Sequence, residues 1–180
     1  MIIDNFLPSY NLLKDFSKTC TFEDEVNPVD GVVYPYICKE LPAEVKKDLL
    51  EQLGILFRRN IINPVMFLRM SPEGVPLPHR FHTDSSMGKF SFMLYLDNKP
   101  EAGTGFYRHI PTDQVRPEHS LEKVIEDCND NEKWQLESKA DMVENRAVIF
   151  DSELFHAALP FGGYGKTQDD ARIVCTVFFS

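Results

Sequence analysis

Apolar residues recur with helical spacing in the first third of the chain. Between Leu41 and Arg59 they fall on one side of the expected helix, at Val45, Leu49, Leu53 and Leu56. Pro42 stands in the first turn, where a helix tolerates proline because the missing N–H has no helical partner there. This spacing predicts a long helix over Leu41 to Arg59, and a shorter helix is expected over Tyr10 to Phe16.

Short apolar or alternating runs, separated by glycine and proline, make up much of the remaining chain. The run from Asn63 to Met70 alternates two sets of side chains, and the turn-rich segment Ser71 to Pro78 ends it. Strands are expected at Gly31 to Ile37, Asn63 to Met70, Phe81 to Ser85, Phe90 to Leu96, Thr104 to His109, Ala147 to Phe150 and Ala171 to Phe179. Many short strands after a helical N-terminal region predict a mostly β fold with flanking helices, namely a double-sheet jelly roll with helices on one face.

Length and composition favour one domain. A chain of 180 residues that is 43% hydrophobic can bury one sizeable core and is too short for two ordinary domains. The polar stretch from Pro111 to Asn145, with an expected helix at Leu121 to Asp127, is interpreted as an insertion in that domain.

Charge and cysteine content exclude several classes of function. The formal net charge of -9 argues against a nucleic-acid backbone or an anionic membrane as the main partner, because such binders need a cationic surface. The 4 cysteines lie far apart and form no C-x-x-C pair, so neither a sulfur-based zinc site nor a dithiol redox motif is indicated. Scattered thiols, and an N-terminus without a basic segment leading into an apolar one, predict a soluble, cytoplasmic protein.

The segment His79 to Asp84 carries the first candidate chemistry. In an extended strand, residues two apart project from the same face, so the side chains of His82 and Asp84 are expected to point together. An imidazole and a carboxylate arranged in this way supply two of the three ligands of a facial triad, which leaves iron positions open for other molecules. Taken alone, an H-x-D pair is more often a chance arrangement on a solvated strand.

A third metal ligand must come from another part of the chain. Three histidines follow the H-x-D pair, and His119 lies within the polar stretch. His156 follows a strand that ends in polar residues, and it precedes the small pair Ala157 and Ala158, a context that predicts a position at the mouth of a sheet. His156 is therefore the preferred third ligand, with His109 in reserve and a hydrogen-bonded core histidine as the alternative interpretation.

Arg172 opens the last expected strand, where period-two geometry places it on the same face as Val174, Thr176 and Phe178. A cation among apolar side chains is expensive unless an anion pairs with it, and the planar guanidinium suits the end of a small dicarboxylic acid. A salt bridge to Asp169 or Asp170 at the edge of the strand is the simpler alternative.

These residues, in their order along the chain, resemble the iron(II)- and 2-oxoglutarate-dependent oxygenases, especially the prolyl-4-hydroxylase-like group. The resemblance rests on His82-Thr83-Asp84, Gly103-Thr104-Gly105-Phe106-Tyr107, Phe150-Asp151-Ser152 leading to His156, and finally Arg172. It covers roughly Val65 to Phe179, and the N-terminal third matches only as generic supporting structure. The distance from His156 to Arg172 is long, and Val174 stands where many members of the family carry a hydroxyl group.

The resemblance implies a double-stranded β-helix in which His82, Asp84 and His156 bind Fe(II). It further implies that Arg172 pairs with the C5 carboxylate of the co-substrate 2-oxoglutarate and that Tyr95 donates a hydrogen bond to it. The implied reaction uses O2, releases succinate and CO2, and hydroxylates a small molecule or an amino-acid or peptide residue. The polar stretch 111–145 and the loop Phe161 to Lys166 would then flank the iron as lids.

Two other classes of function remain open at this point. One is a non-catalytic, cupin-like jelly-roll module that binds a metal or none. The other is an interaction module whose acidic stretch, with Trp134, Glu126, Asp127 and Asp130, docks a basic partner. Arg172 favours the oxygenase, because neither module needs a lone arginine inside its barrel. The sequence specifies neither the substrate nor the oligomeric state.

Overall fold

The computed structural model describes residues 1–26, 31–119 and 121–180. These residues form two antiparallel β-sheets. In spatial order, the larger sheet contains β1 (Ile2–Ile3), β8 (Ala147–Asp151), β5 (Phe90–Tyr95), β10 (Arg172–Phe179), β4 (Val65–Ser71), β3 (Val33–Cys38) and β2 (Glu23–Val26). The smaller sheet contains β7 (Trp134–Asp141), β6 (Gly103–His109) and β9 (His156–Leu159).

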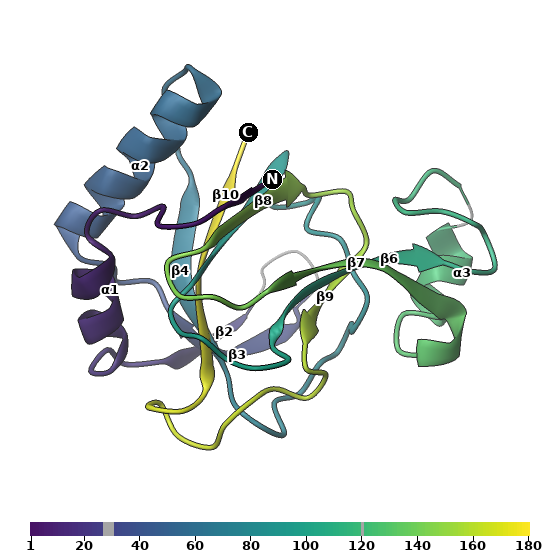
Figure 1. Ribbon diagram of the computed structural model, residues 1–180. Helices are drawn as coiled ribbons and strands as arrows, with labels where there is room; N and C mark the ends of the chain where they lie inside the picture. Colours follow the sequence, from purple (N-terminus) through teal and green to yellow (C-terminus); the bar gives the residue numbers. More distant parts are fainter. Residues whose placement is uncertain (27–30, 120) are drawn as a thin grey trace.

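Two helices cover the outer face of the larger sheet. Figure 1 shows α1 (Tyr10–Ser17) and α2 (Ala43–Phe57) together beside β4 and β10. Their apolar sides share one buried core with alternate residues of those strands. Leu49 of α2, Leu68 of β4 and Cys175 of β10 belong to this core. The helical spacing of apolar residues in the sequence thus reflects burial against a sheet.

The inner face of the larger sheet has a separate core. Tyr95, Val148, Phe150 and Val174 pack there with residues of the smaller sheet. Every residue of β10 is buried, because odd-numbered positions face the helices and even-numbered positions face the smaller sheet. Arg172 therefore lies on the inner face, between the two sheets.

A short helix, α3 (Leu121–Glu126), and the 3-10 turn Asn131–Lys133 lie at the other end of the molecule. They sit beyond the ends of β6 and β7 (Figure 1). Among the residues that the structure describes, no helix is long and apolar enough to cross a membrane.

Most of the expected elements are present, with ends shifted by a residue or two. The predicted strand at Phe81 to Ser85 is wrong, because only His82 makes a bridge there. Four strands, β1, β2, β7 and β9, were not predicted. Of these, β7 lies inside the polar stretch that was interpreted as an insertion, and it pairs with β6 along its whole length.

Candidate metal centre

Three different segments hold the backbone around His82 and Asp84. The N–H of Phe81 donates to the carbonyl of Cys128 at 3.0 Å, and the N–H of Asp84 donates to the carbonyl of Ser152 at 2.9 Å. Between them, His82 exchanges two backbone hydrogen bonds with His156, at 3.1 and 3.0 Å. Because successive groups bond to different partners, no regular ladder forms, and this is why the expected strand is absent.

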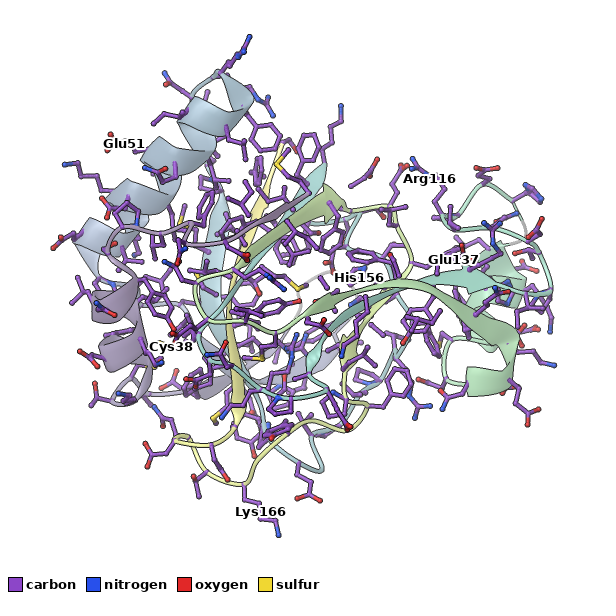
Figure 2. All side chains as sticks on the ribbon, viewed as in Figure 1. Cys38, Glu51, Arg116, Glu137, His156 and Lys166 are labelled. Carbon is purple, nitrogen blue, oxygen red and sulfur yellow. The ribbon has the colours of Figure 1, made fainter. Side chains whose placement is uncertain are left out.

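His156 is the first residue of β9 and is fixed from both sides. It pairs with Phe106 of β6 on one side and with His82 on the other. Its side chain is buried, and the ring of Phe150 packs edge-on against it at 4.8 Å between ring centres. Figure 2 places His156 in the interior of the molecule, away from α1 and α2.

The polar side chains of these three residues converge. Their potential metal-binding atoms all lie within 4.8 Å of one another. Nε2 of His156 is 3.1 Å from Oδ2 of Asp84, and Nε2 of His82 is 3.8 Å from Oδ1 of the same carboxylate. The sequence prediction that His82 and Asp84 point together is confirmed, although separate backbone contacts to His156 and Ser152, and not strand periodicity, position them.

Backbone carbonyls orient both imidazole rings. Nδ1 of His82 lies 3.2 Å from the carbonyl oxygen of Arg80, and Nδ1 of His156 lies 2.9 Å from that of Leu154. A carbonyl oxygen can only accept, so we assign the proton of each neutral ring to Nδ1. Each Nε2 then directs a lone pair toward the centre of the cluster, which is the orientation a metal requires.

Nε2 of His156 is buried and has no hydrogen-bond partner, even though Oδ2 of Asp84 lies close to it. The two atoms are close together, and the charge of the Asp84 carboxylate raises the pKa of His156. A buried unpaired nitrogen is unfavourable unless something binds it. The donor set of two imidazoles and one carboxylate fits a divalent transition metal such as iron.

Two buried serines support the carboxylate. Oγ of Ser91 donates to Oδ2 of Asp84 at 3.1 Å, and it lies 2.9 Å from Oγ of Ser152. The sequence analysis missed both serines. A single serine between Phe90 and Phe92 in a buried strand was the only signal for Ser91.

The protonation states suit a metal site. Burial, helped by the charge of His156, lowers the pKa of His82 to about 4. Burial alone would raise the pKa of Asp84, but the charges of the two neighbouring histidines and the hydrogen bond from Ser91 act in the opposite direction, and the pKa is lowered to about 2. At neutral pH, His82 is therefore neutral and Asp84 is ionised. The charge of Asp84 raises the pKa of His156, so a metal must displace any proton that His156 holds in its absence.

Arg172 lies on the inner face of the larger sheet, and no acidic side chain among the described residues pairs with it. Its Nη2 donates to the carbonyl of Gly103 at 3.1 Å, whereas its buried Nε has no partner. Burial lowers the pKa of this guanidinium to about 10. The carboxylate of Asp170 instead accepts hydrogen bonds from Lys166 and Thr167, so the simple edge salt bridge to Asp170 is not formed.

Tyr95 is fully buried at the end of β5, opposite Val174 of β10. Its hydroxyl lies 2.8 Å from Oγ1 of Thr104 and 3.2 Å from the carbonyl of Ala140. Burial raises its pKa, and the positive charge of Arg172 acts in the opposite direction. Tyr95 and Arg172 therefore belong to the same buried region.

The reserve ligand His109 is not part of the cluster. It is buried elsewhere, with Nε2 3.0 Å from Asp127 and Nδ1 2.8 Å from Thr112. Trp134 is also buried, and its indole donates to the backbone of Asp127 at 2.9 Å. These contacts tie the polar stretch to β6 and β7, so Trp134 and Asp127 do not form an exposed docking surface as the interaction hypothesis supposed.

Structural comparison supports the expected fold. A Pseudomonas putida prolyl-4-hydroxylase aligns over 99% of this chain and 90% of its own, with 19% identity and a TM-score of 0.57. HygX from Streptomyces hygroscopicus, solved with nickel and 2-oxoglutarate bound, aligns over 98% of this chain and 80% of its own, with 13% identity and a TM-score of 0.58.

A third solved structure is a Trichoplax adhaerens prolyl hydroxylase in complex with a peptide fragment of hypoxia inducible factor. It aligns over 99% of this chain and 82% of its own, with 16% identity and a TM-score of 0.58. No protein-family model matches the sequence, and no curated protein matches it. The predicted double-stranded β-helix fold of the 2-oxoglutarate oxygenases is thus confirmed, and the His-Asp-His cluster resembles the facial triad of these enzymes.

Proposed function

We propose that this protein is an iron(II)- and 2-oxoglutarate-dependent dioxygenase that hydroxylates a small molecule or an amino-acid or peptide residue. In this proposal His82, Asp84 and His156 hold the iron, and Arg172 binds the C5 carboxylate of 2-oxoglutarate. Bound iron would supply the activation of O2, coupled to oxidation of the co-substrate to succinate and CO2.

The observation that carries the proposal is the pairing of two unsatisfied groups in one interior. Nε2 of His156 and Nε of Arg172 are both buried, and neither has a hydrogen-bond partner among the described residues. A metal ion would be coordinated by the imidazole of His156, and a dicarboxylate would pair with the guanidinium of Arg172. A metal-binding module without a co-substrate gives no reason for the buried arginine.

The chain has three tasks in this reaction. The carbonyls of Arg80 and Leu154 keep the imidazoles in their metal-binding tautomer, and Ser91 holds the carboxylate of Asp84. Arg172, with a hydrogen bond from Tyr95, would fix the far end of the co-substrate and so set its orientation. The apolar side chains around His156, such as Phe106 and Phe150, would keep bulk water from the oxidising site.

Two segments are candidate lids. The polar stretch 111–145 borders a cavity of roughly 340 Å³ that is lined by Phe106, Phe150 and Leu154 among others. The loop Phe161 to Lys166 follows β9 and leads to Arg172. We propose that these segments shape the entrance for the primary substrate.

Turnover of the co-substrate tests the activity. Protein loaded with Fe(II) and exposed to O2 and 2-oxoglutarate is expected to release succinate, measured by proton NMR, even in slow turnover without a primary substrate. His82→Ala should abolish the release, while the exposed His119→Ala should not. Equal succinate release by wild type and His82→Ala, or none from either, would favour the cupin-like binding module.

A further inference from the structure

A second arginine lies on the same inner face as Arg172. Arg69 of β4 is directly opposite Val174 of β10, and Val174 is directly opposite Tyr95 of β5. Residues directly opposite each other in antiparallel strands project from the same face of the sheet. Arg69 therefore shares its face with Val174, Tyr95 and Arg172.

Arg69 has no acidic partner among the residues that the structure describes. Its Nε is buried without a hydrogen bond, and none of the ion pairs in the described part of the chain includes it. The guanidinium lies 5.7 Å from the ring centre of Tyr34, a cation–π contact. The residue as a whole is half-buried.

The charge of Arg69 acts on the candidate metal centre and on Arg172. Burial lowers the pKa of Arg69, whereas the carboxylate of Asp84 acts to raise it. Its positive charge in turn acts to lower the pKa of His82, His156 and Arg172. Arg69 is therefore electrostatically coupled to both the iron site and the co-substrate site.

The strand register makes Arg69 and Arg172 diagonal neighbours. Arg172 pairs with Ser71, two residues beyond Arg69 on the same strand. Diagonal positions on neighbouring strands are about 7–8 Å apart, so the two like charges repel each other in a poorly solvated interior. Such an arrangement is unfavourable unless each guanidinium binds an anion.

When iron(II) and 2-oxoglutarate are both bound, the charges around them balance without Arg69. If iron(II) and 2-oxoglutarate bind as proposed, the metal and Arg172 are balanced by Asp84 and the two carboxylates of the co-substrate. Arg69 then remains positive and without an acidic partner among the described residues, on the inner face that also carries Arg172. A second negative group, separate from the co-substrate, would balance this charge.

We propose that Arg69 binds a carboxylate group of the primary substrate, an inference that rests on the proposed function. The substrate class that we propose is a small carboxylic acid or a free amino acid, whose own carboxylate lies close to the carbon that reacts, whereas an internal peptide residue has no free α-carboxylate. The planar guanidinium can take both carboxylate oxygens and so orient the substrate beside the metal. The competing role, a second contact to 2-oxoglutarate, is separated from this one by the test.

The test titrates a small monocarboxylate into the loaded protein. Under anaerobic conditions, protein with Fe(II) and saturating 2-oxoglutarate is titrated with butyrate and, separately, with butyramide. High-spin iron(II) is paramagnetic, so ligand protons that bind beside it relax faster, and proton NMR measures both binding and proximity. We expect saturable relaxation enhancement with butyrate and none with butyramide.

Substitutions of arginine test whether butyrate binds at Arg69. Arg69→Gln should weaken butyrate binding at least tenfold, and Arg69→Lys, which keeps the charge, should weaken it less. Arg59→Gln removes an exposed arginine of equal charge and should behave like the wild type. The charge-transfer band of the iron–2-oxoglutarate complex shows that each variant is folded and loaded.

Three results would overturn the inference: no saturable butyrate binding to the loaded wild type, equal binding to Arg69→Gln, or a need for more 2-oxoglutarate in Arg69→Gln. The last result would assign Arg69 to the co-substrate. If the wild type never forms the iron–2-oxoglutarate complex, the failure appears before butyrate is added, and the proposed function itself is wrong.

Discussion

Nε2 of His156 and Oδ2 of Asp84 lie 3.1 Å apart, and yet the imidazole nitrogen has no hydrogen-bond partner. The two atoms face the same point from β9 and from the segment that follows His82. The carboxylate is ionised and the neighbouring imidazole of His82 is neutral at neutral pH. A bound cation would satisfy both groups, so it is expected to stabilise the fold.

Metal addition should therefore raise the thermal stability of the wild type. With Fe(II) under anaerobic conditions, or with Zn(II) as a stable substitute, the midpoint of unfolding is expected to increase with metal concentration. Asp84→Ala should lose most of this increase, because it removes the only anionic ligand. Calorimetry with and without chelator measures the effect, and an equal increase in Asp84→Ala would contradict the assigned site.

Ser91 is expected to act on the metal through Asp84. Ser91→Ala removes the hydrogen bond to Oδ2 and leaves the hydroxyl of Ser152 without its partner. Loss of such an outer contact typically weakens metal affinity about ten- to a hundredfold. Metal titration against a fluorescent chelator checks this, with the exposed Ser86→Ala as the control. Unchanged affinity in Ser91→Ala would show that the serine has no role in orienting the carboxylate.

Arg172 should contribute to function at the expense of stability. Arg172→Met removes a buried cation that has only one hydrogen bond, so the ligand-free variant is expected to unfold at the same or a higher temperature than the wild type. The stabilisation of the metal-loaded protein by 2-oxoglutarate should disappear in the same variant. Differential scanning fluorimetry measures both. A large loss of stability without ligand would mean that Arg172 has a structural role.

Two adjacent glycines test how the loop before β10 is anchored. Gly162 and Gly163 have similar positive φ values, 85° and 89°, so alanine is strained equally at both. An added Cβ at Gly162 meets open space, whereas at Gly163 it collides with the backbone of Pro72. Gly163→Ala is expected to lower the free energy of unfolding by about 1–3 kcal/mol more than Gly162→Ala, as measured by urea denaturation. Equal losses would show that the loop does not pack against Pro72 in solution.

The spacing of apolar residues along the chain predicted the helices and strands that pack against the main core over their whole length. Apolar residues recur at regular spacing in the helix Ala43–Phe57 and in the strands Val65–Ser71 and Arg172–Phe179, because these elements lie against the main core. The strand Trp134–Asp141 escaped prediction because it is mostly exposed and carries polar residues on both faces. Its pairing with Gly103–His109 is a long-range contact that no local pattern contains.

The candidate site was predictable only in part, for a related reason. His82, Asp84, His156 and Arg172 stood out because polar groups with metal- or anion-binding chemistry occurred beside apolar runs. Arg69 and Ser91 lie within strands, and only the strand pairing shows that they face the same interior. From the sequence alone, the candidate ligands could be predicted, but the groups that surround them could not.

The most direct test of the central claim is the anaerobic visible spectrum of the protein on addition of Fe(II) and then 2-oxoglutarate. We expect a weak metal-to-ligand charge-transfer band that His82→Ala lacks, that His119→Ala retains, and that Arg172→Ala forms only at higher 2-oxoglutarate concentration. Absence of the band from folded wild-type protein at saturating iron and 2-oxoglutarate would contradict the assignment of this protein as a 2-oxoglutarate-dependent oxygenase.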